Sequence, residues 1–121
     1  MTFDKTNNKS TGNLGEDLAA EYLLKNKYKI LGRNINIKVG EIDILADDRG
    51  TIVIVEVKTV RGSGFGLAQD LVRYKKQNKL KLLARALTQK YPNKTIRIDV
   101  IGVDFSCGLP AKIEHIVNAV Y

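Results

Sequence analysis

Two runs of β-branched residues, separated by a short polar segment, limit what this chain can fold into. Residues 41–46 read EIDILA and residues 51–58 read TIVIVEVK, and both are rich in the Ile and Val side chains that favour strands. The intervening residues 47–50, DDRG, contain the Asp and Gly typical of a turn. We therefore predict a β-hairpin in which a four-residue turn pairs Ala46 with Thr51.

Further helix and strand patterns flank this hairpin. The pattern Asn13-Leu-Gly-Glu16 is a capping box that predicts a helix to about Asn26, and a Lys- and Leu-rich segment predicts a second helix over residues 73–91. Alternating apolar and polar residues predict three more strands, at residues 28–37, 95–105 and 111–117. The expected fold class is α/β, a mixed sheet of about four or five strands flanked by the helices in the order αβββαβ(β). Residues 1–10 are expected to form a flexible tail, and residues 11–121 a single domain.

The basic residues are concentrated around the second predicted helix. The chain of 121 residues carries 20 Lys and Arg against 13 Asp and Glu, a formal net charge of +7. Residues 71–98 hold nine of the basic residues and no acidic residue, so the remainder of the chain is slightly acidic. Such a segment favours a polyanionic partner, most commonly nucleic acid. The alternative is a solvated helix face, which is the expectation for Lys81 and Arg85.

The single cysteine, Cys107, and the single histidine, His115, exclude several kinds of site. One cysteine cannot form an intramolecular disulfide or a thiolate zinc site, and one histidine disfavours a His-dependent hydrolase. Both residues are expected to have packing or surface roles. The polar N-terminus lacks the apolar core of a signal peptide, and no apolar run approaches the ~20 residues that span a bilayer. We therefore expect a cytoplasmic protein with no membrane partner.

Acidic residues on the two hairpin strands are expected to share one face of the sheet. Because side chains alternate along a strand, Glu41 and Asp43 share a face of the first strand. By the same rule Glu56 and Lys58 share a face of the second strand. With the four-residue turn, Asp43 lies opposite Ile54 and diagonal to Glu56, with Cα atoms ~7–8 Å apart.

Carboxylates gathered in this way repel one another, and a divalent cation such as Mg²⁺ removes that repulsion through oxygen ligands. The alternative interpretation is an exposed Glu56–Lys58 ion pair on a half-solvated strand. The matching face of Asp43 and the basic segment downstream favour the metal site.

The spacing of these residues is similar to that of a known group of nucleases. Asp43, twelve intervening residues and then Glu56-Val-Lys58 resemble the PD-(D/E)xK nuclease superfamily, with Ile42 in place of the proline. Glu16 matches the additional acid of the archaeal Holliday junction resolvases in that superfamily. The further segments Gly12-Asn-Leu-Gly-Glu16, Gly40-Glu-Ile-Asp43, Val55-Glu-Val-Lys-Thr59, Lys76-Gln77 and Arg97-Ile-Asp-Val100 resemble the YraN family of small bacterial proteins. This likeness covers nearly the whole chain from Gly12 onward.

The resemblance implies a restriction-endonuclease-like fold and a role for each motif residue. Asp43, Glu56 and the backbone carbonyl of Val57 would bind Mg²⁺ or Mn²⁺, and Glu16 would add a ligand directly or through water. Lys58 would orient the attacking water and stabilise the phosphate. The roles of two acids stay open. Glu16 could instead cap the helix. Glu41 could be a metal ligand, an acid that hydrogen-bonds to the ligands, or a residue at the solvated end of the strand.

Phosphate contacts are expected at the start of the basic helix. The candidates are Lys75, Lys76, Gln77 and Lys79, together with Arg61 after the second hairpin strand. The leading hypothesis is a Mg²⁺- or Mn²⁺-dependent deoxyribonuclease, acting on linear or branched DNA. A second hypothesis is a catalytically silent nucleic-acid-binding module of the same fold, and a third is a subunit whose basic helix binds an acidic protein. The likeness to junction resolvases suggests a homodimer.

Overall fold

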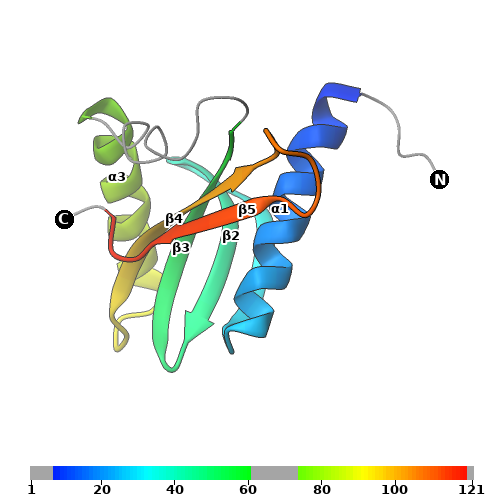
Figure 1. Ribbon diagram of the computed structural model, residues 1–121. Coiled ribbons are helices and arrows are strands. Elements are labelled where there is room, and N and C mark those ends of the chain that lie inside the picture. The colour runs from blue at the N-terminus through cyan, green and yellow to red at the C-terminus, as the bar shows by residue number, and fades with distance from the viewer. Residues whose placement is uncertain (1–6, 61–73, 120–121) are drawn as a thin grey trace.

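The computed structural model describes residues 7–60 and 74–119, whose elements follow the expected order (Figure 1). The helices are α1 (Asn7–Lys25) and α3 (Tyr74–Lys90). The strands are β1 (Lys29–Ile37), β2 (Gly40–Asp48), β3 (Thr51–Val60), β4 (Ile96–Asp104) and β5 (Lys112–Ile116). The α/β class and the last strand, expected at residues 111–117, are thereby confirmed.

The five strands form one mixed sheet in the order β1-β2-β3-β4-β5. Neighbouring strands are antiparallel except β3 and β4, which are parallel. A parallel pair needs a crossover connection, and α3 lies in the connection between these two strands. Helix α1 covers one face of the sheet and α3 the other, so the central strands are enclosed between the helices (Figure 1).

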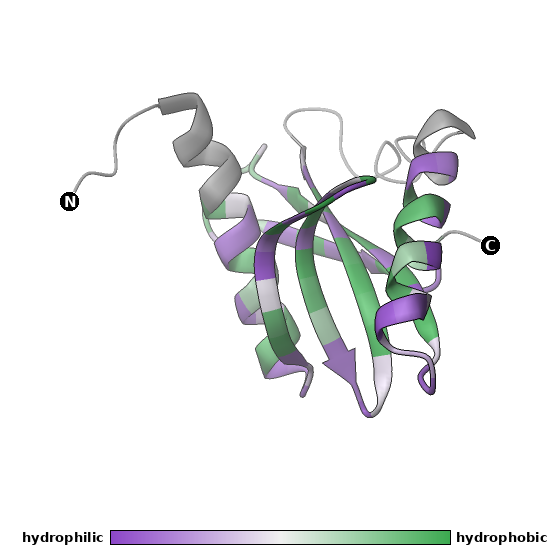
Figure 2. Ribbon diagram, turned by 180° about the vertical axis from the view of Figure 1, so that it is seen from behind, coloured by the Kyte–Doolittle hydropathy of each residue, from purple (hydrophilic) through white to green (hydrophobic). Residues whose placement is uncertain are grey.

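Strand β3 contributes side chains to a separate apolar cluster on each face of the sheet. Val53 and Val55 pack in the α1 cluster, with α1 residues Ala19 and Leu23. Ile52 and Ile54 pack in the α3 cluster, with Leu80, Leu83 and Leu87 of α3. Burial on both faces explains why the first half of β3 is a continuous apolar run, visible as green central strands in Figure 2. The run is interrupted at Glu56, which is only half-buried.

The start of α1 differs from the prediction. The helix begins at Asn7 rather than at Asn13, so Asn13 and Glu16 lie inside the helix. The capping-box interpretation of Glu16 is therefore wrong, because a cap must stand at the first turn. Residues 7–10, expected to belong to the flexible tail, form the first turn of α1, while residues 1–6 lie outside the described part of the chain.

The hairpin turn is shorter than predicted. Asp48 pairs with Thr51, so only Arg49 and Gly50 lie in the turn, and the predicted Ala46–Thr51 pairing is wrong. Both turn residues have positive φ, 50° and 96°, as the tight two-residue turn of a twisted hairpin requires. The Oδ1 atom of Asp47 accepts a hydrogen bond from the N–H of Gly50 at 2.7 Å. The register thus moves by two positions, an even number that leaves Asp43 and Glu56 on one face of the sheet, as predicted.

Candidate functional site

The candidate site lies where β2 separates from β3. The paired positions of these two strands end at Ile44 and Val55. Beyond that point β3 stays paired with β4 to its end, and β2 stays paired with β1 down to Gly40. Asp43 lies at the point of separation, where its Oδ2 atom accepts a hydrogen bond from the backbone N–H of Val57 at 2.8 Å. This side chain therefore links the two strands where their own pairing stops.

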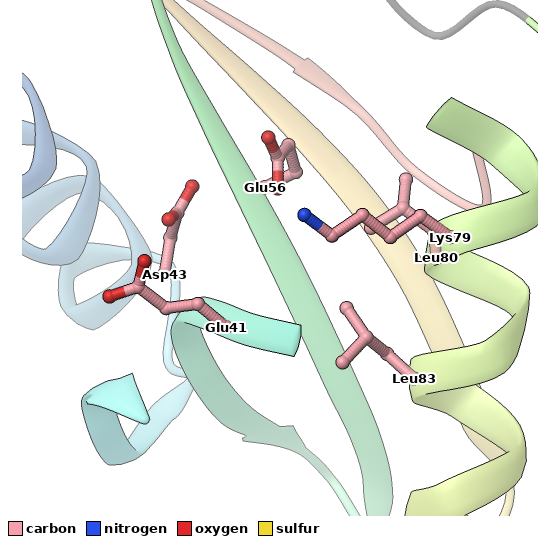
Figure 3. Close-up of a pocket in the computed structure, with 6 residues that line it drawn as sticks. All are labelled: Glu41, Asp43, Glu56, Lys79, Leu80 and Leu83. Carbon is pink, nitrogen blue, oxygen red and sulfur yellow. The ribbon is translucent and has the colours of Figure 1, made fainter. Parts of the chain in front are cut away.

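A small acidic pocket of about 140 Å³ opens beside this point. Its lining comes from β2, β3 and α3 and consists of Glu41, Asp43, Glu56, Lys79, Leu80 and Leu83. In Figure 3 the carboxylates of Glu41 and Asp43 lie near each other on one side and Glu56 on the other. The ammonium group of Lys79 extends from α3 toward the space between them. The predicted gathering of Glu41, Asp43 and Glu56 on one face is thus present.

The carboxyl group of Asp43 is the one most perturbed by this environment. Burial raises the pKa of Asp43 to about 6, against an ordinary value of 3.8. The hydrogen bond from Val57 opposes this shift, whereas the negative charges of Glu56, Glu16 and Glu41 raise the pKa further. The folded chain therefore holds a carboxylate where the net local charge is already negative, a situation that a bound cation would relieve.

Lys58 and Glu56 form the ion pair expected for neighbours on one face of β3. The Nζ atom of Lys58 lies 3.4 Å from Oε2 of Glu56. The Glu56 side chain is only 14% exposed and the Lys58 side chain 28%, so the pair is not a solvated surface feature. Glu56 also lines the acidic pocket, so Lys58 is ion-paired to one of the pocket's carboxylates.

Glu16 faces the site from α1 but is already bound by basic and amide groups. Its Oε1 atom accepts hydrogen bonds from Arg33 Nε at 3.2 Å, from Arg33 Nη2 at 3.1 Å and from Asn34 Nδ2 at 3.0 Å. Arg33 also bonds to Asp17 Oδ1 at 2.6 Å. Glu16 is near enough to raise the pKa of Asp43, yet its carboxylate is held by a guanidinium. Direct metal ligation would require Glu16 to release Arg33.

Two glycines allow the close approaches that shape this region. A Cβ atom on Gly15 would lie 2.6 Å from Thr59 Oγ1, so only glycine lets α1 lie this close to the end of β3. Gly40 has a φ of +152°, and a Cβ there would lie 3.2 Å from Cε of Lys79. The missing side chain at Gly40 leaves room for the Lys79 stem as it crosses toward the acids.

Comparison with known families gives a clear assignment. Residues 15–103 match the family described as "Uncharacterised protein family UPF0102". The chain belongs to the UPF0102 family. The matched range includes all three acids of the pocket and Lys79, so the site lies within the part of the chain that defines this family. The likeness to the YraN family expected from the sequence is thereby confirmed.

Full-length relatives support the UPF0102 assignment. A UPF0102 protein of Desulforamulus reducens is 42% identical over 116 residues, covering 92% of this chain and 95% of the relative. UPF0102 proteins of Trichlorobacter lovleyi and Geobacter metallireducens are each 45% identical, over 115 and 114 residues. Each comparison covers 93% of this chain, with 91% and 93% of the respective relative.

One solved structure similar to this UPF0102 chain is titled "Structure of EndoMS-dsDNA2 complex". The two chains are 26% identical with a TM-score of 0.46, and the likeness covers 69% of this chain and 34% of the other. This chain thus spans about a third of the length of that protein. Separately, none of the helices in the described ranges is long and apolar enough to cross a membrane.

The structure describes the side chain of only one of the five residues predicted to contact phosphate in this UPF0102 chain. Lys79 lies on α3 and lines the acidic pocket, beside the carboxylates rather than apart from them. Lys75, Lys76 and Gln77 belong to the first turn of α3, but their side chains lie outside what the structure describes. Arg61 lies outside the described residues altogether. Contacts by these four residues therefore stay predictions.

The metal roles predicted for the pocket acids are not tested by the described side chains. Within residues 14–59 and 78–119, whose side chains are described, no group of three or more His, Cys, Asp or Glu is placed to hold a metal ion. The pocket acids are close enough for Glu56 and Glu41 to raise the pKa of Asp43. The metal roles of Asp43, Glu56, Glu16 and the Val57 carbonyl stay predictions.

A second polar cluster, on the α1 face, was missed by the sequence analysis. Asp99 is fully buried and accepts hydrogen bonds from His115 Nε2 at 2.7 Å, Arg97 Nε at 2.9 Å and the N–H of Asn118 at 3.0 Å. Tyr22 on α1 hydrogen-bonds to Nδ1 of His115 at 3.1 Å. The pairing of Arg97 with Asp99 joins two residues on one face of β4. The role of His115 left no local signal, because it lies 16 residues from Asp99 and 93 from Tyr22.

Proposed function

We propose that this chain is a metal-dependent nuclease that hydrolyses DNA phosphodiester bonds with Mg²⁺ or Mn²⁺ in the acidic pocket. The observation that carries the proposal is the environment of Asp43, a half-buried carboxylate whose pKa is raised by burial and by three acidic neighbours. Such a site is unfavourable until positive charge enters it. The PD-(D/E)xK spacing of Asp43, Glu56 and Lys58 points to the same chemistry.

The residues of the pocket fit a hard divalent cation. Asp43 and Glu56 offer oxygen ligands from adjacent strands, and Glu41 adds a third carboxylate at the pocket edge. Glu16 would act through water, because its Oε1 atom is bound by Arg33 and Asn34. When bound, a divalent cation lowers the pKa of a water molecule and screens charge on the phosphate.

The basic residues supply the rest of the proposed chemistry. Lys58, held against Glu56, would orient the attacking water. Lys79 extends over the pocket from α3 and would neutralise a phosphate oxygen entering from that side. A histidine base is not required, and the only histidine is bound to Asp99 on the other face of the sheet.

Cleavage of labelled linear, flapped and four-way DNA, with Mg²⁺ or Mn²⁺, tests the proposal. Asp43→Asn keeps the shape of the side chain and removes its charge, so we expect cleavage to fall by at least about a hundredfold. Glu21→Gln is the matched control, because Glu21 is an exposed acid on α1 and lines no part of the acidic pocket. Cleavage that survives both Asp43→Asn and Asp43→Ala would rule out this site.

A second candidate function is nucleic-acid binding without turnover. It is favoured by the Lys79 ammonium group, which extends toward the acids from within the chain, and by the lack of three converging ligands among the described side chains. This alternative predicts strongly salt-dependent DNA binding and no cleavage with any divalent ion. Calorimetric titration with Mg²⁺ and Mn²⁺ separates the two, since only the nuclease requires a metal ion bound at Asp43.

A further inference from the structure

A second groove, of about 320 Å³, lies beside the acidic pocket. It is formed by the turn between β1 and β2 and by the exposed side of α3, and its lining residues are Lys38, Val39, Leu82, Arg85, Ala86 and Gln89. The α3 members recur at three- and four-residue spacing, so they form one stripe along the helix. Of these residues, Arg85 was expected to lie on a solvated helix face.

The groove continues the acidic pocket along the same two elements. Val39 in the groove is two residues before Glu41 in the pocket, and Leu82 in the groove is followed directly by Leu83 in the pocket. A chain molecule lying between the β1–β2 turn and α3 would therefore extend from one hollow to the other. The distance that such a molecule would span is set by the helix, which rises about 1.5 Å per residue.

The charge of the groove is entirely positive. Lys38 and Arg85 are both exposed and line it, and no acidic residue does. Among the described residues neither forms an ion pair, in contrast to Arg33 and Arg97, whose guanidinium groups are bound to carboxylates. Two basic groups without acidic partners, Lys38 from the β1–β2 turn and Arg85 from α3, are suited to phosphates of a polyanion.

Part of the lining of the groove, here called its floor, consists of the apolar side chains of Val39 and Leu82. Binding of a duplex would not require such side chains. Val39 is 40% exposed and Leu82 47%, although both are large aliphatic side chains. The outer surface of a duplex presents phosphates and sugars, whereas an unpaired strand also presents the apolar faces of its bases. A groove that combines cations with exposed aliphatic side chains therefore fits an unpaired strand better than a duplex.

We infer that this groove binds an unpaired segment of a DNA strand, with phosphates on Lys38 and Arg85 and a base against Val39 and Leu82. The position of the cut relative to this segment rests on the proposed nuclease function, because the acidic pocket is lined by residues next in sequence to those of the groove. The substrate class is thus DNA with a single-stranded portion next to the scissile bond.

Binding to fluorescent DNA in EDTA tests the groove without any cleavage. The full chain is titrated with a single strand, a forked duplex and a blunt duplex of equal phosphate number, and we expect the first two to bind more tightly. In Lys38→Gln/Arg85→Gln the loss of two phosphate contacts should weaken single-strand binding about tenfold at 0.15 M salt and reduce the salt slope by about 1.4. Lys25→Gln/Lys29→Gln removes the same charge from exposed positions elsewhere and should change neither value appreciably.

Leu82→Ser tests the apolar floor. Because Leu82 is already half-exposed, the substitution should leave folding intact while reducing the preference for the single strand over the blunt duplex. Three results would overturn the inference: equal binding of all three DNAs, an unchanged preference in Leu82→Ser, or equal competition by polyglutamate, which would indicate an acidic protein partner.

The same variants keep this inference separate from the proposed function. If Asp43→Asn abolishes cleavage while the groove variants bind normally, the nuclease proposal stands and the groove inference is wrong. If the groove variants lose single-strand binding while the wild-type chain cleaves no DNA with any metal, the groove inference stands and the nuclease proposal is wrong.

Discussion

Each face of the sheet carries a buried or half-buried aspartate, and the pKa values of the two are shifted in opposite directions. On the α1 face, burial alone would raise the pKa of Asp99, but hydrogen bonds from His115, Arg97 and Asn118 hold it below its ordinary value. On the α3 face, burial raises the pKa of Asp43 to about 6, and the neighbouring acids add to the effect. Asp99 has its cation built into the fold, whereas Asp43 has acidic neighbours. This difference favours a structural role for Asp99, and it is the basis on which we propose that Asp43 binds a ligand.

Removing the cation from the α1 face should have the largest effect on folding. Arg97→Met leaves the buried Asp99 without its guanidinium, so we expect the free energy of unfolding to fall by about 3–5 kcal/mol. Urea denaturation measures the loss. The double variant Arg97→Met/Asp99→Leu removes both charges and should recover much of it, and a double variant as unstable as the single would show that packing, not charge, is responsible.

Removing the charge of Asp43 from the α3 face should raise the stability of the fold rather than lower it. The pKa of Asp43 is higher in the folded chain than the 3.8 of the unfolded chain, so the folded state binds more protons between about pH 4 and pH 6 and loses stability as pH rises through that range. Asp43→Asn avoids this loss. With EDTA present, we expect it to be more stable than wild type by about 1–3 kcal/mol at pH 8, allowing for solvent screening, and by almost nothing at pH 4. Equal stability at pH 8 would contradict the environment described for Asp43.

A cation bound at Asp43 should give this aspartate the positive partner that Asp99 already has in Arg97. At a Mg²⁺ or Mn²⁺ concentration of ten times Kd, wild type should gain about 1.4 kcal/mol of stability from metal binding. Asp43→Asn should gain little, because a ligand is missing. Thermal unfolding with and without the metal measures the gain in both proteins, and metal-free buffer with EDTA serves as the reference. An equal gain in both proteins would place the metal elsewhere.

The smallest effect is expected where α1 approaches the end of β3. Gly15→Ala places a Cβ atom 2.6 Å from Thr59 Oγ1, and relieving that overlap should cost about 1 kcal/mol net of the better helix propensity of alanine. In Thr59→Ala the obstructing atom is absent, so Gly15→Ala should be neutral or stabilising in that background. A double-mutant cycle by urea denaturation gives the interaction energy.

The sequence predicted the fold well because the strongest patterns are local. The order of elements and the shared face of Asp43 and Glu56 follow from alternation along β2 and β3, which needs no knowledge of distant residues. The turn was placed wrongly because Asp47 and Asp48 have turn-forming side chains but are the last residues of β2. The shorter turn is defined by the pairing of Asp48 with Thr51 and by the positive φ of Arg49, which is unusual for a non-glycine residue.

The parts of the site that sequence reasoning missed depend on contacts between distant elements. Glu16 looked like a helix cap or a metal ligand, but Arg33 on β1 determines its environment. Lys79 was expected to bind phosphate, and the acids beside it became visible only with the packing of α3 against β2. Gly15 and Gly40 were present in the quoted motifs, but a glycine in a motif does not tell which atom approaches it.

The hydrogen-bond networks around the two aspartates also differ in the longest sequence separation that they join. The Asp43–Val57 bond joins residues 14 apart, so a local hairpin with its low loop-closure entropy is enough to form it. The Tyr22–His115 bond joins residues 93 apart and requires α1 and the last strand to be in place together. The strands that carry the candidate site can therefore assemble early in folding, while the network around Asp99 closes only on the completed sheet.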